Sequence, residues 1–485
     1  MITDQVKIHD KFSVEIKLGF HARRKTEVND FGVNTWIFIP YSLDINRSTY
    51  SKQDFYRDLK SNIRLITPDY LLRDISVKEK EPFSLLEKAL EELANGATRT
   101  RIAAYEYHIR MFVSIVKSAL RDEIQHIQEN NIEEDLDFLV DSLIDNIRRT
   151  ASNYRNLRRI INVPTVSREL MNYFWFGDEF LSNLYEQHCF KLIDGLDKTG
   201  RLTPDIRKKL METIQSEVEY KRAKGFPVVE KTSPDRNREL VFRLNLLKKY
   251  AENELFLATN TRRDGIWIEQ IYFSIAAGIS MIFATAIAFS FQQKFGNFTM
   301  PFFVALVVSY MLKDRIKELA RYYFAHRLGR RFFDHRTDIG LSEHQIGWSK
   351  ESMVFVPEEK IPAEVLKVRN RSAILEADNR NNREQIILYR KLVRLNRQSL
   401  DDCSQYPTTG MNDIIRFNVS NFIQKMDNPV VPLYSPGDNG TIEIVKGEKM
   451  YYINLVLQFN NENQLEYKRY RIVLNRKGIR EIEKF

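Results

Sequence analysis

The stretch from Ile271 to Phe291, IYFSIAAGISMIFATAIAFSF, decides how this chain is organised. It is 21 residues long, and no charged residue occurs between Gln270 and Gln293. At a rise of about 1.5 Å per residue, an α-helix of this length spans about 30 Å, the thickness of a bilayer core. A buried core helix is the alternative, but soluble cores rarely need a helix this long that is apolar on every side. The stretch therefore predicts a transmembrane helix.

A second uncharged segment runs from Phe295 to Leu312, after a short polar link. Its 18 residues are near the lower limit for a membrane span. Pro301 fits the first turn of a helix, where the backbone amides lack partners. If the helix begins only at Pro301, then Lys313 and Arg315 must extend toward the interface, or the segment is re-entrant. We predict a two-helix transmembrane hairpin over residues 266–312 and an integral membrane protein.

Basic residues lie at the outer ends of this hairpin, whereas the link between its helices offers only Lys294. Because basic residues mark the cytoplasmic side, both chain termini are predicted to be cytoplasmic, with the inner (cytoplasmic) membrane as the location. Residues 313–348 are predicted to form a basic amphipathic helix that contacts anionic lipid headgroups. The predicted membrane-surface residues are Lys313, Arg315, Lys317, Arg321, Arg327, Arg330 and Arg331.

Small residues recur every four positions along the first predicted membrane helix, at Ala276, Ser280, Ala284 and Ala288. Such a stripe lets helix backbones approach closely in lipid. It indicates either packing of the two hairpin helices within one chain or a homo-oligomer. No ionisable residue lies within either span, which argues against a proton relay or an ion-coupled transporter.

Length and charge set wider limits on the chain. At 485 residues it should contain two or three domains. A net charge of +9 suits an anionic membrane surface or a nucleic acid. Two distant cysteines, Cys189 and Cys403, give no disulfide framework. We expect no cleavable signal peptide, because the sequence begins without an apolar run.

The soluble parts differ in their periodicity. Residues 1–82 are predicted to form a small α/β module, because residues 12–20 alternate as a half-buried strand does and residues 36–39 fit a central strand. Residues 83–265 are predicted to form a cytosolic helical bundle, since apolar residues hold a 3.6-residue period in 109–127.

Residues 349–485 are predicted to form a β-rich C-terminal domain with an antiparallel meander. The strands of this meander are expected at 441–445, 450–459 and 464–475, and a polar helix is expected within 372–400. The apolar face slips by one residue near Arg469, which predicts a bulge there. The predicted fold class is therefore an α+β membrane protein.

The sequence contains no motif of the phosphate-loop, dinucleotide-binding, zinc-protease or serine-hydrolase type, and we expect no cofactor and no metal site. An arginine-rich stretch in the helical region is the candidate anion site, for a phosphate-bearing ligand or a nucleic acid. A solvated face and a lipid-facing surface are the alternatives. The residues are Arg148, Arg149, Arg155, Arg158 and Arg159.

Three function classes survive this reasoning. The first is a non-enzymatic, membrane-tethered scaffold or sensor whose cytoplasmic domains bind a ligand or an unidentified protein partner. The second is a pore-forming effector that oligomerises through the small-residue stripe and is gated by its cytoplasmic domains. The third is a membrane-bound enzyme with an unfamiliar site.

Overall fold

The computed structural model describes residues 1–485 except 24–25, 131, 297–298, 324–332, 342–343, 380–382, 439–440 and 462–463. The chain forms two compact units. We call residues 1–62, 258–400 and 413–485 the sheet unit, and residues 63–257 and 401–412 the helical unit. The fold is α+β with large antiparallel sheets, so the predicted fold class is confirmed at that level.

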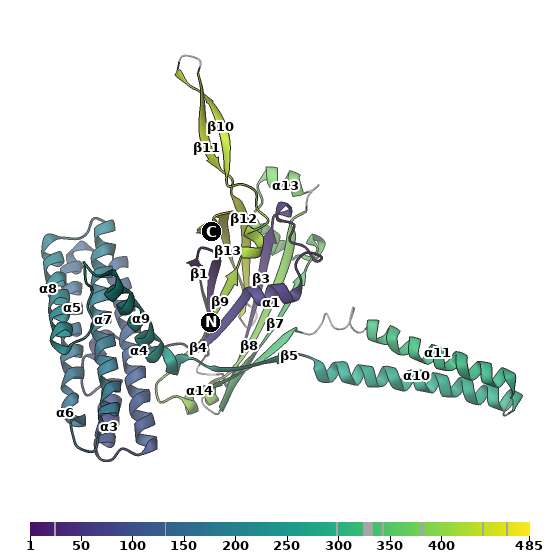
Figure 1. Ribbon diagram of the computed structural model, residues 1–485, viewed down its shortest axis with the longest axis horizontal. Helices are drawn as coiled ribbons and strands as arrows, with labels where there is room; N and C mark the ends of the chain where they lie inside the picture. Colours follow the sequence, from purple (N-terminus) through teal and green to yellow (C-terminus); the bar gives the residue numbers. More distant parts are fainter. Residues whose placement is uncertain are drawn as a thin grey trace. The chain divides into compact units, whose positions relative to one another are not determined.

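The helical unit is a bundle of long helices (Figure 1). Its helices are α2 (Leu72–Ile75), α3 (Phe83–Ala94), α4 (Arg99–Glu129), α5 (Glu133–Asn156), α6 (Arg158–Ile161), α7 (Arg168–Lys198), α8 (Pro204–Lys224) and α9 (Pro234–Glu252). Hydroxyl side chains at Thr98, Ser167 and Thr203 cap the first amides of α4, α7 and α8. In the core, the ring of Tyr154 stacks on Phe112 and Phe174, with centroids 5.8 and 4.8 Å apart.

The sheet unit contains three antiparallel arrangements among its described residues. The four-stranded sheet has the order β1 (Ile2–Asp10), β2 (Ser13–His21), β9 (Gly410–Asn418), β4 (Leu59–Leu65). The eight-stranded sheet has the order β14 (Gly478–Lys484), β13 (Gln464–Asn475), β12 (Tyr451–Asn461), β3 (Val28–Ile39), β8 (Gln385–Asn396), β7 (His344–Phe355), β6 (His335–Leu341), β5 (Ala258–Arg263). The two-stranded ribbon pairs β10 (Val430–Pro436) with β11 (Ile442–Glu448).

Short helices complete the sheet unit: α1 (Lys52–Asp58), α12 (Ala363–Arg369), α13 (Ala373–Asn379) and α15 (Ser420–Ile423), with α14 (Arg397–Cys403) at the boundary between the units. A capping box formed by Ser51 and Asp54 begins α1. That helix ends at Asp58, and the chain continues as strand β4.

Strand β3 explains why the structure divides the chain differently from the domains 1–82, 83–265 and 349–485. β3 pairs with β12 on one side and with β8 on the other. Residues from the first 62 positions and from the C-terminal region therefore share one sheet and one core. Backbone pairing between residues this far apart in sequence leaves no local signal for a sequence-based prediction.

Two predicted helices are strands in the structure. The polar helix expected within 372–400 is wrong over residues 385–396, which form β8, whereas α13 and the start of α14 are helical. The basic helix expected over 313–348 is wrong from residue 335 onward, where β6 and β7 lie. The bulge expected near Arg469 is also wrong, because β12 and β13 pair without interruption; the irregularity lies between Val473 and Leu474, against β14.

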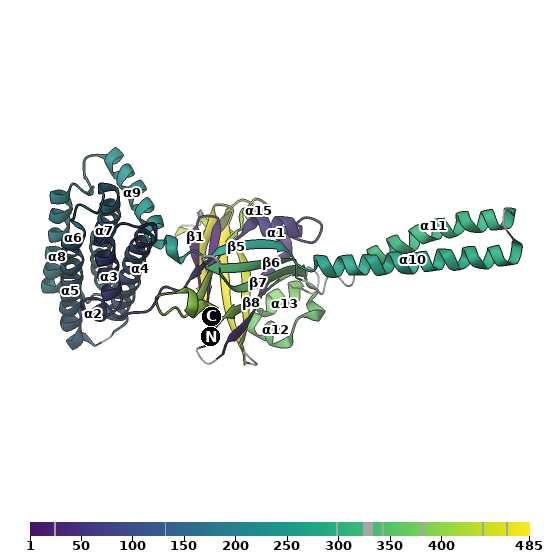
Figure 2. The same cartoon turned by 90° about the horizontal axis from the view of Figure 1, so that it is seen from below.

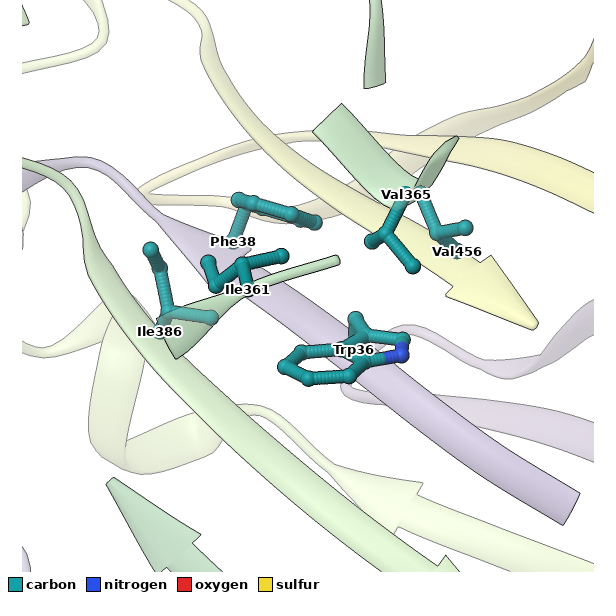
Figure 3. Close-up of a cluster of buried hydrophobic side chains, with 6 residues drawn as sticks. All are labelled: Trp36, Phe38, Ile361, Val365, Ile386 and Val456. Atoms are coloured by element: carbon teal, nitrogen blue, oxygen red, sulfur yellow. The ribbon is translucent and has the colours of Figure 1, made fainter. Parts of the chain in front are cut away.

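A cluster of buried apolar side chains fixes α12 on the eight-stranded sheet (Figure 3). Ile361 and Val365 come from α12 and the turn before it, and they contact side chains of β3, β8 and β12. The sheet residues of the cluster are Trp36, Phe38, Ile386 and Val456.

Helices α10 (Ile266–Phe295) and α11 (Met300–Tyr323) lie side by side (Figures 1 and 2). Among the described residues, α10 is the one helix long and apolar enough to cross a membrane by length and composition. Most of its large apolar side chains are exposed, including Ile271, Ile282 and Phe289. Strands β5 and β6 pair directly, with Arg263 opposite His335. This pairing brings together the two chain segments that lead into α10 and follow α11.

Candidate functional site

A basic pocket of about 960 Å³ lies in the sheet unit, where α12 ends beside β12 and β13. We call it the basic pocket. One acidic side chain, Glu384, and two amides, Asn370 and Asn454, line it. Its basic lining residues are Arg369, Arg371, Lys449, Arg469 and Arg471. An excess of cationic side chains in a partly enclosed pocket attracts anions.

Arg469 is the least satisfied of these cations. Only 6% of the residue is exposed, and its Nη2 donates one long hydrogen bond, of 3.4 Å, to Oδ1 of Asn454. Its Nε is buried without a hydrogen-bond partner in the described part of the chain. Burial lowers the pKa of Arg469, and repulsion from the neighbouring Arg369 and Arg471 lowers it further. A buried cation in this state favours an anion beside it.

The strand geometry explains why these arginines meet. Arg469 and Arg471 are two positions apart on β13, so their side chains leave the same face of the sheet. The residues paired with them on β12 are Val456 and Asn454. Val456 belongs to the cluster that α12 covers (Figure 3), so both arginines stand on the α12 side of the sheet.

The last residue of α12 supplies a second buried guanidinium. Arg369 is 3% exposed and lies over the ring of Phe38 at 5.5 Å. Its Nη2 donates to Oε1 of Glu384 at 2.7 Å, and Arg371 donates from Nε to Oε2 of the same carboxylate at 2.8 Å. Glu384 therefore holds both arginines. Nε of Arg369 and Nη2 of Arg371 remain buried without a partner among the described residues.

Aromatic side chains and weaker ion pairs form the rim of the basic pocket. The guanidinium of Arg471 lies 4.8 Å from the ring of Phe485 and 5.5 Å from that of Tyr452. Its Nη1 donates to Oε2 of Glu483 at 3.0 Å. Lys449 forms an ion pair with Asp427 and is partly exposed. The rim cations are thus partly neutralised, whereas Arg469 is not.

A second pocket, of about 570 Å³, lies between α1 and the junction of β5 and α10. Its charges are internally paired. Lys52 and the hydroxyl of Tyr56 both donate to the carboxylate of Asp334, at 2.5 and 2.9 Å. Arg263 lies 3.0 Å from Glu269. These bonds join α1 to the segment before β6 and join β5 to the start of α10, and they leave less net charge for a ligand.

The arginines predicted to form an anion site are not alike in the structure. Arg155 is inside the helical unit, with Nη2 2.6 Å from Glu217 and Nε 3.2 Å from Asp178. Its guanidinium also lies 3.5 Å from the ring centroid of Tyr220. The pKa of Arg155 is raised despite the opposing effect of burial, because Glu217 and Asp178 stabilise its charge.

The other four predicted arginines, Arg148, Arg149, Arg158 and Arg159, are exposed, and Arg158 lies over the ring of Trp175 at 5.0 Å.

The small-residue stripe is divided in the structure. Ala276 and Ser280 are the buried residues of α10, and Ala305 and Ser309 are the buried residues of α11. Ala284 and Ala288 are partly exposed. The first half of the stripe is thus covered where the two helices of one chain pack together.

Part of the predicted membrane-surface set lies on α11. The ammonium of Lys313 is 3.8 Å from the ring centroid of Tyr310, and Arg321 is 3.7 Å from Glu318. Arg315 is exposed and Lys317 is partly exposed. The predictions for Arg327, Arg330 and Arg331 lie outside the described residues.

Comparison with known proteins gives no family to which this site belongs. No family model, no curated protein and no solved structure matches the chain. Within the described residues, no group of three or more His, Cys, Asp or Glu side chains could hold a metal ion.

The sequence contained one signal for the basic pocket. The apolar alternation of residues 464–475 is interrupted at Arg469, and from sequence alone this interruption predicts a bulge. Because the strand is regular, the interruption is a charged residue at an inward-facing position. An inward charge on a regular strand is rare enough to indicate a functional or ion-pair site.

Proposed function

We propose that the protein is a membrane-anchored sensor that binds an anionic ligand in the basic pocket. The observation that carries this proposal is Arg469, a buried arginine that lines the pocket, forms no salt bridge among the described residues and has a buried Nε without a hydrogen-bond partner there. Leaving a charge buried and unpaired costs several kcal/mol. A bound anion would offset that cost, which supports binding rather than a purely structural role.

The anchor in this proposal is α10 together with α11. The exposed apolar surface of α10 suits lipid, and close packing at Ser280 and Ser309 suits helix association within a bilayer. The pairing of Arg263 with His335 brings both ends of the helical pair to the same place, so the sheet unit would lie on one side of the membrane. The basic residues beyond the helices favour the cytoplasmic side.

One sheet carries both the pocket and the anchor, which supports a sensor over a passive tether. β12 and β13 line the basic pocket, whereas β5 and β6 connect to the anchor. β3, β8 and β7 lie between them in the same hydrogen-bonded sheet. The pore-forming alternative is not favoured, because Ala276 and Ser280 of the small-residue stripe are covered by the chain's own α11.

The membrane part of the proposal is tested by alkaline extraction and by reporters fused to the two termini. The intact chain should stay with the membrane and report both termini as cytoplasmic. A variant with residues 266–332 replaced by a short Gly–Ser linker should be soluble. Because β5 and β6 are paired neighbours, a short linker can connect them as a β-hairpin. Release of the intact chain by alkali, or a reporter on the far side, would overturn the anchor.

The binding part is tested by calorimetry with tripolyphosphate on the purified full chain in detergent. Arg469→Met should abolish binding, because Met keeps much of the side-chain volume and removes the charge. Arg148→Ala is the matched control, since it removes an exposed arginine outside the pocket. Absence of tripolyphosphate binding in the wild type, or equal binding by Arg469→Met, would contradict an anion site.

A further inference from the structure

The geometry points to a nucleotide as the anionic ligand, with its phosphates at the buried arginines and its base on the aromatic rim. This inference rests on the proposed function and names the ligand class of the same pocket. It depends on three features of the pocket: the number of unmatched guanidinium nitrogens, the volume, and the placement of the rings.

The phosphate end follows from the buried donors. Nε of Arg369, Nη2 of Arg371 and Nε of Arg469 are all buried without a hydrogen-bond acceptor among the described residues, and all three residues line the pocket. Guanidinium groups are planar and form bidentate hydrogen bonds with phosphate oxygens, and a phosphate offers several acceptor oxygens. A single carboxylate carries one negative charge and two oxygens, so it offers less charge and fewer acceptor atoms to these donors than a phosphate does.

The pocket has room for more than a phosphate. The pocket holds about 960 Å³, near the upper end of the range for small-molecule sites. One inorganic anion would occupy a small part of that space and would leave the rest to water. A ligand with an organic part would fill the volume between the buried arginines and the rim.

The rim is suited to a planar ring. Tyr41 and Tyr452, which are 58% and 46% exposed as residues, line the pocket, and Tyr451 and Phe485 also line it. Exposed aromatic rings beside a cationic pocket provide stacking surfaces for a nucleobase. The amides of Asn370 and Asn454 can both donate and accept hydrogen bonds, as the edge of a base requires.

A lipid headgroup is the other source of clustered phosphates for a protein with a membrane anchor. An inositol phosphate has the charge but no planar ring, so it separates the two sources. The probes are therefore ATP, tripolyphosphate and inositol trisphosphate, each titrated calorimetrically into the purified full chain in detergent at one fixed salt concentration.

We expect ATP to bind at least about tenfold more tightly than tripolyphosphate, and inositol trisphosphate to gain no such advantage. Tyr452→Ala should weaken ATP binding by about 5- to 100-fold, the range for loss of one base-stacking ring, and should weaken tripolyphosphate binding by much less. Tyr434→Ala is the control, because this tyrosine is also exposed to solvent, on β10, and does not line the pocket. Thermal unfolding of each variant checks that the fold is retained.

The outcomes distinguish a failure of the nucleotide inference from a failure of the anion-binding proposal. Equal affinity for ATP and tripolyphosphate, with Tyr452→Ala silent, overturns the nucleotide and leaves the anion sensor standing. Tighter binding of inositol trisphosphate than of ATP overturns the nucleotide in favour of a lipid headgroup. Failure of all three probes to bind overturns both the nucleotide and the anion site.

Discussion

Lys391 on β8 and Asp413 on β9 form a buried ion pair that joins the eight-stranded sheet to the four-stranded sheet. Their side chains are 2% and 0% exposed. Asp413 also accepts a hydrogen bond from the hydroxyl of Ser61 at 2.6 Å, and Glu351 lies 3.8 Å from Lys391. Burial opposes the charge of Lys391, but the attraction of Asp413 and Glu351 raises its pKa above the usual value.

Removing one member of this pair should cost more than removing both. Asp413→Leu leaves the Lys391 ammonium buried without its main partner, and we expect the free energy of unfolding to fall by about 3–5 kcal/mol. The double variant Lys391→Met, Asp413→Leu should recover most of that loss, because no buried charge remains at either position. Urea denaturation of all three proteins gives the coupling energy. Additive losses in the double variant would contradict a pairwise interaction.

Unlike the Lys391–Asp413 pair, Arg469 is expected to lower the stability of the ligand-free protein and to serve anion binding. It is buried and forms no salt bridge among the described residues, and neighbouring Arg369 and Arg471 repel it, so its charge opposes folding. Arg469→Met should leave the unfolding free energy unchanged or raise it by about 1 kcal/mol in ligand-free protein, while abolishing anion binding. Thermal unfolding with and without tripolyphosphate measures both effects. A loss of more than about 2 kcal/mol would mean that Arg469 holds the fold together.

These two charges also explain where the sequence misled. The regular period of residues 109–127 and the alternation of residues 451–459 are unbroken, and both were predicted as the structure has them. In β8, the inward-facing positions include Lys391, so alternation is hidden and the stretch resembles an amphipathic helix. In β13, Arg469 interrupts the same pattern and suggests a bulge. An inward charge whose partner lies on a distant strand has no local signature.

The site was harder to predict than the fold because arginine has two opposite roles here. In the helical unit, Arg155 is preceded and followed by other arginines, which suggests an anion site from sequence alone. Its partners Asp178 and Glu217 lie on α7 and α8, and only the packing of those helices shows that its charge is already neutralised. Arg469 stands among mixed residues on its strand, yet the charges near it are mostly of its own sign.

Arg155 should therefore behave as a structural residue. Arg155→Ala leaves the carboxylates of Asp178 and Glu217 buried close together, and we expect a loss of about 2–4 kcal/mol, discounted because the arginine is partly exposed. Arg148→Ala, at an exposed position, should change stability by less than about 0.5 kcal/mol. Denaturant unfolding measures both. Equal stability of the two variants, with loss of heparin retention by Arg155→Ala alone, would restore this residue to an anion site.

Two buried histidines should make the helical unit sensitive to acid. Burial lowers the pKa of both His108 and His188 to about 4, and nearby Lys191 and Lys117 add to the effect at His188. An unfolded histidine titrates near 6.5, so between about pH 6.5 and 4 the unfolded state binds more protons. Stability is thus full above pH 6.5 and falls as the pH drops, by up to about 3 kcal/mol for each histidine.

The measurement is helical circular dichroism during denaturant unfolding at several pH values from 7.5 to 4.5. His188→Leu removes one titrating group and should reduce the acid-dependent loss, although its stability at pH 7.5 is set by packing as well. His126→Leu is the control, because this histidine is exposed on α4 and should not change the slope. A wild-type stability that is flat from pH 7 to 4.5 would contradict neutral, buried histidines.

The packing of α10 on α11 gives the last prediction. Ser280 and Ser309 are buried where the helices meet, and the hydroxyl of Ser280 bonds back to the carbonyl of Ala277 at 2.8 Å. Ser280→Leu places a large side chain at a close approach, and overpacking of this kind costs about 1–3 kcal/mol. Ile282→Leu, two positions away and 69% exposed, changes shape without adding volume and should be nearly silent.

The readout is chemical crosslinking between cysteines introduced at Phe273 and Arg321, whose side chains contact each other across the two helices, by a short thiol-reactive reagent in a background without Cys189 and Cys403. Ser280→Leu should slow intrachain crosslinking in the intact protein, whereas Ile282→Leu should not. Because only the first half of the small-residue stripe is covered, Ala284→Leu gives an independent measurement at a partly exposed position. If Ala284→Leu abolished an oligomer while Ser280→Leu left the intrachain crosslink intact, the stripe would act between chains, and the pore-forming function would regain support.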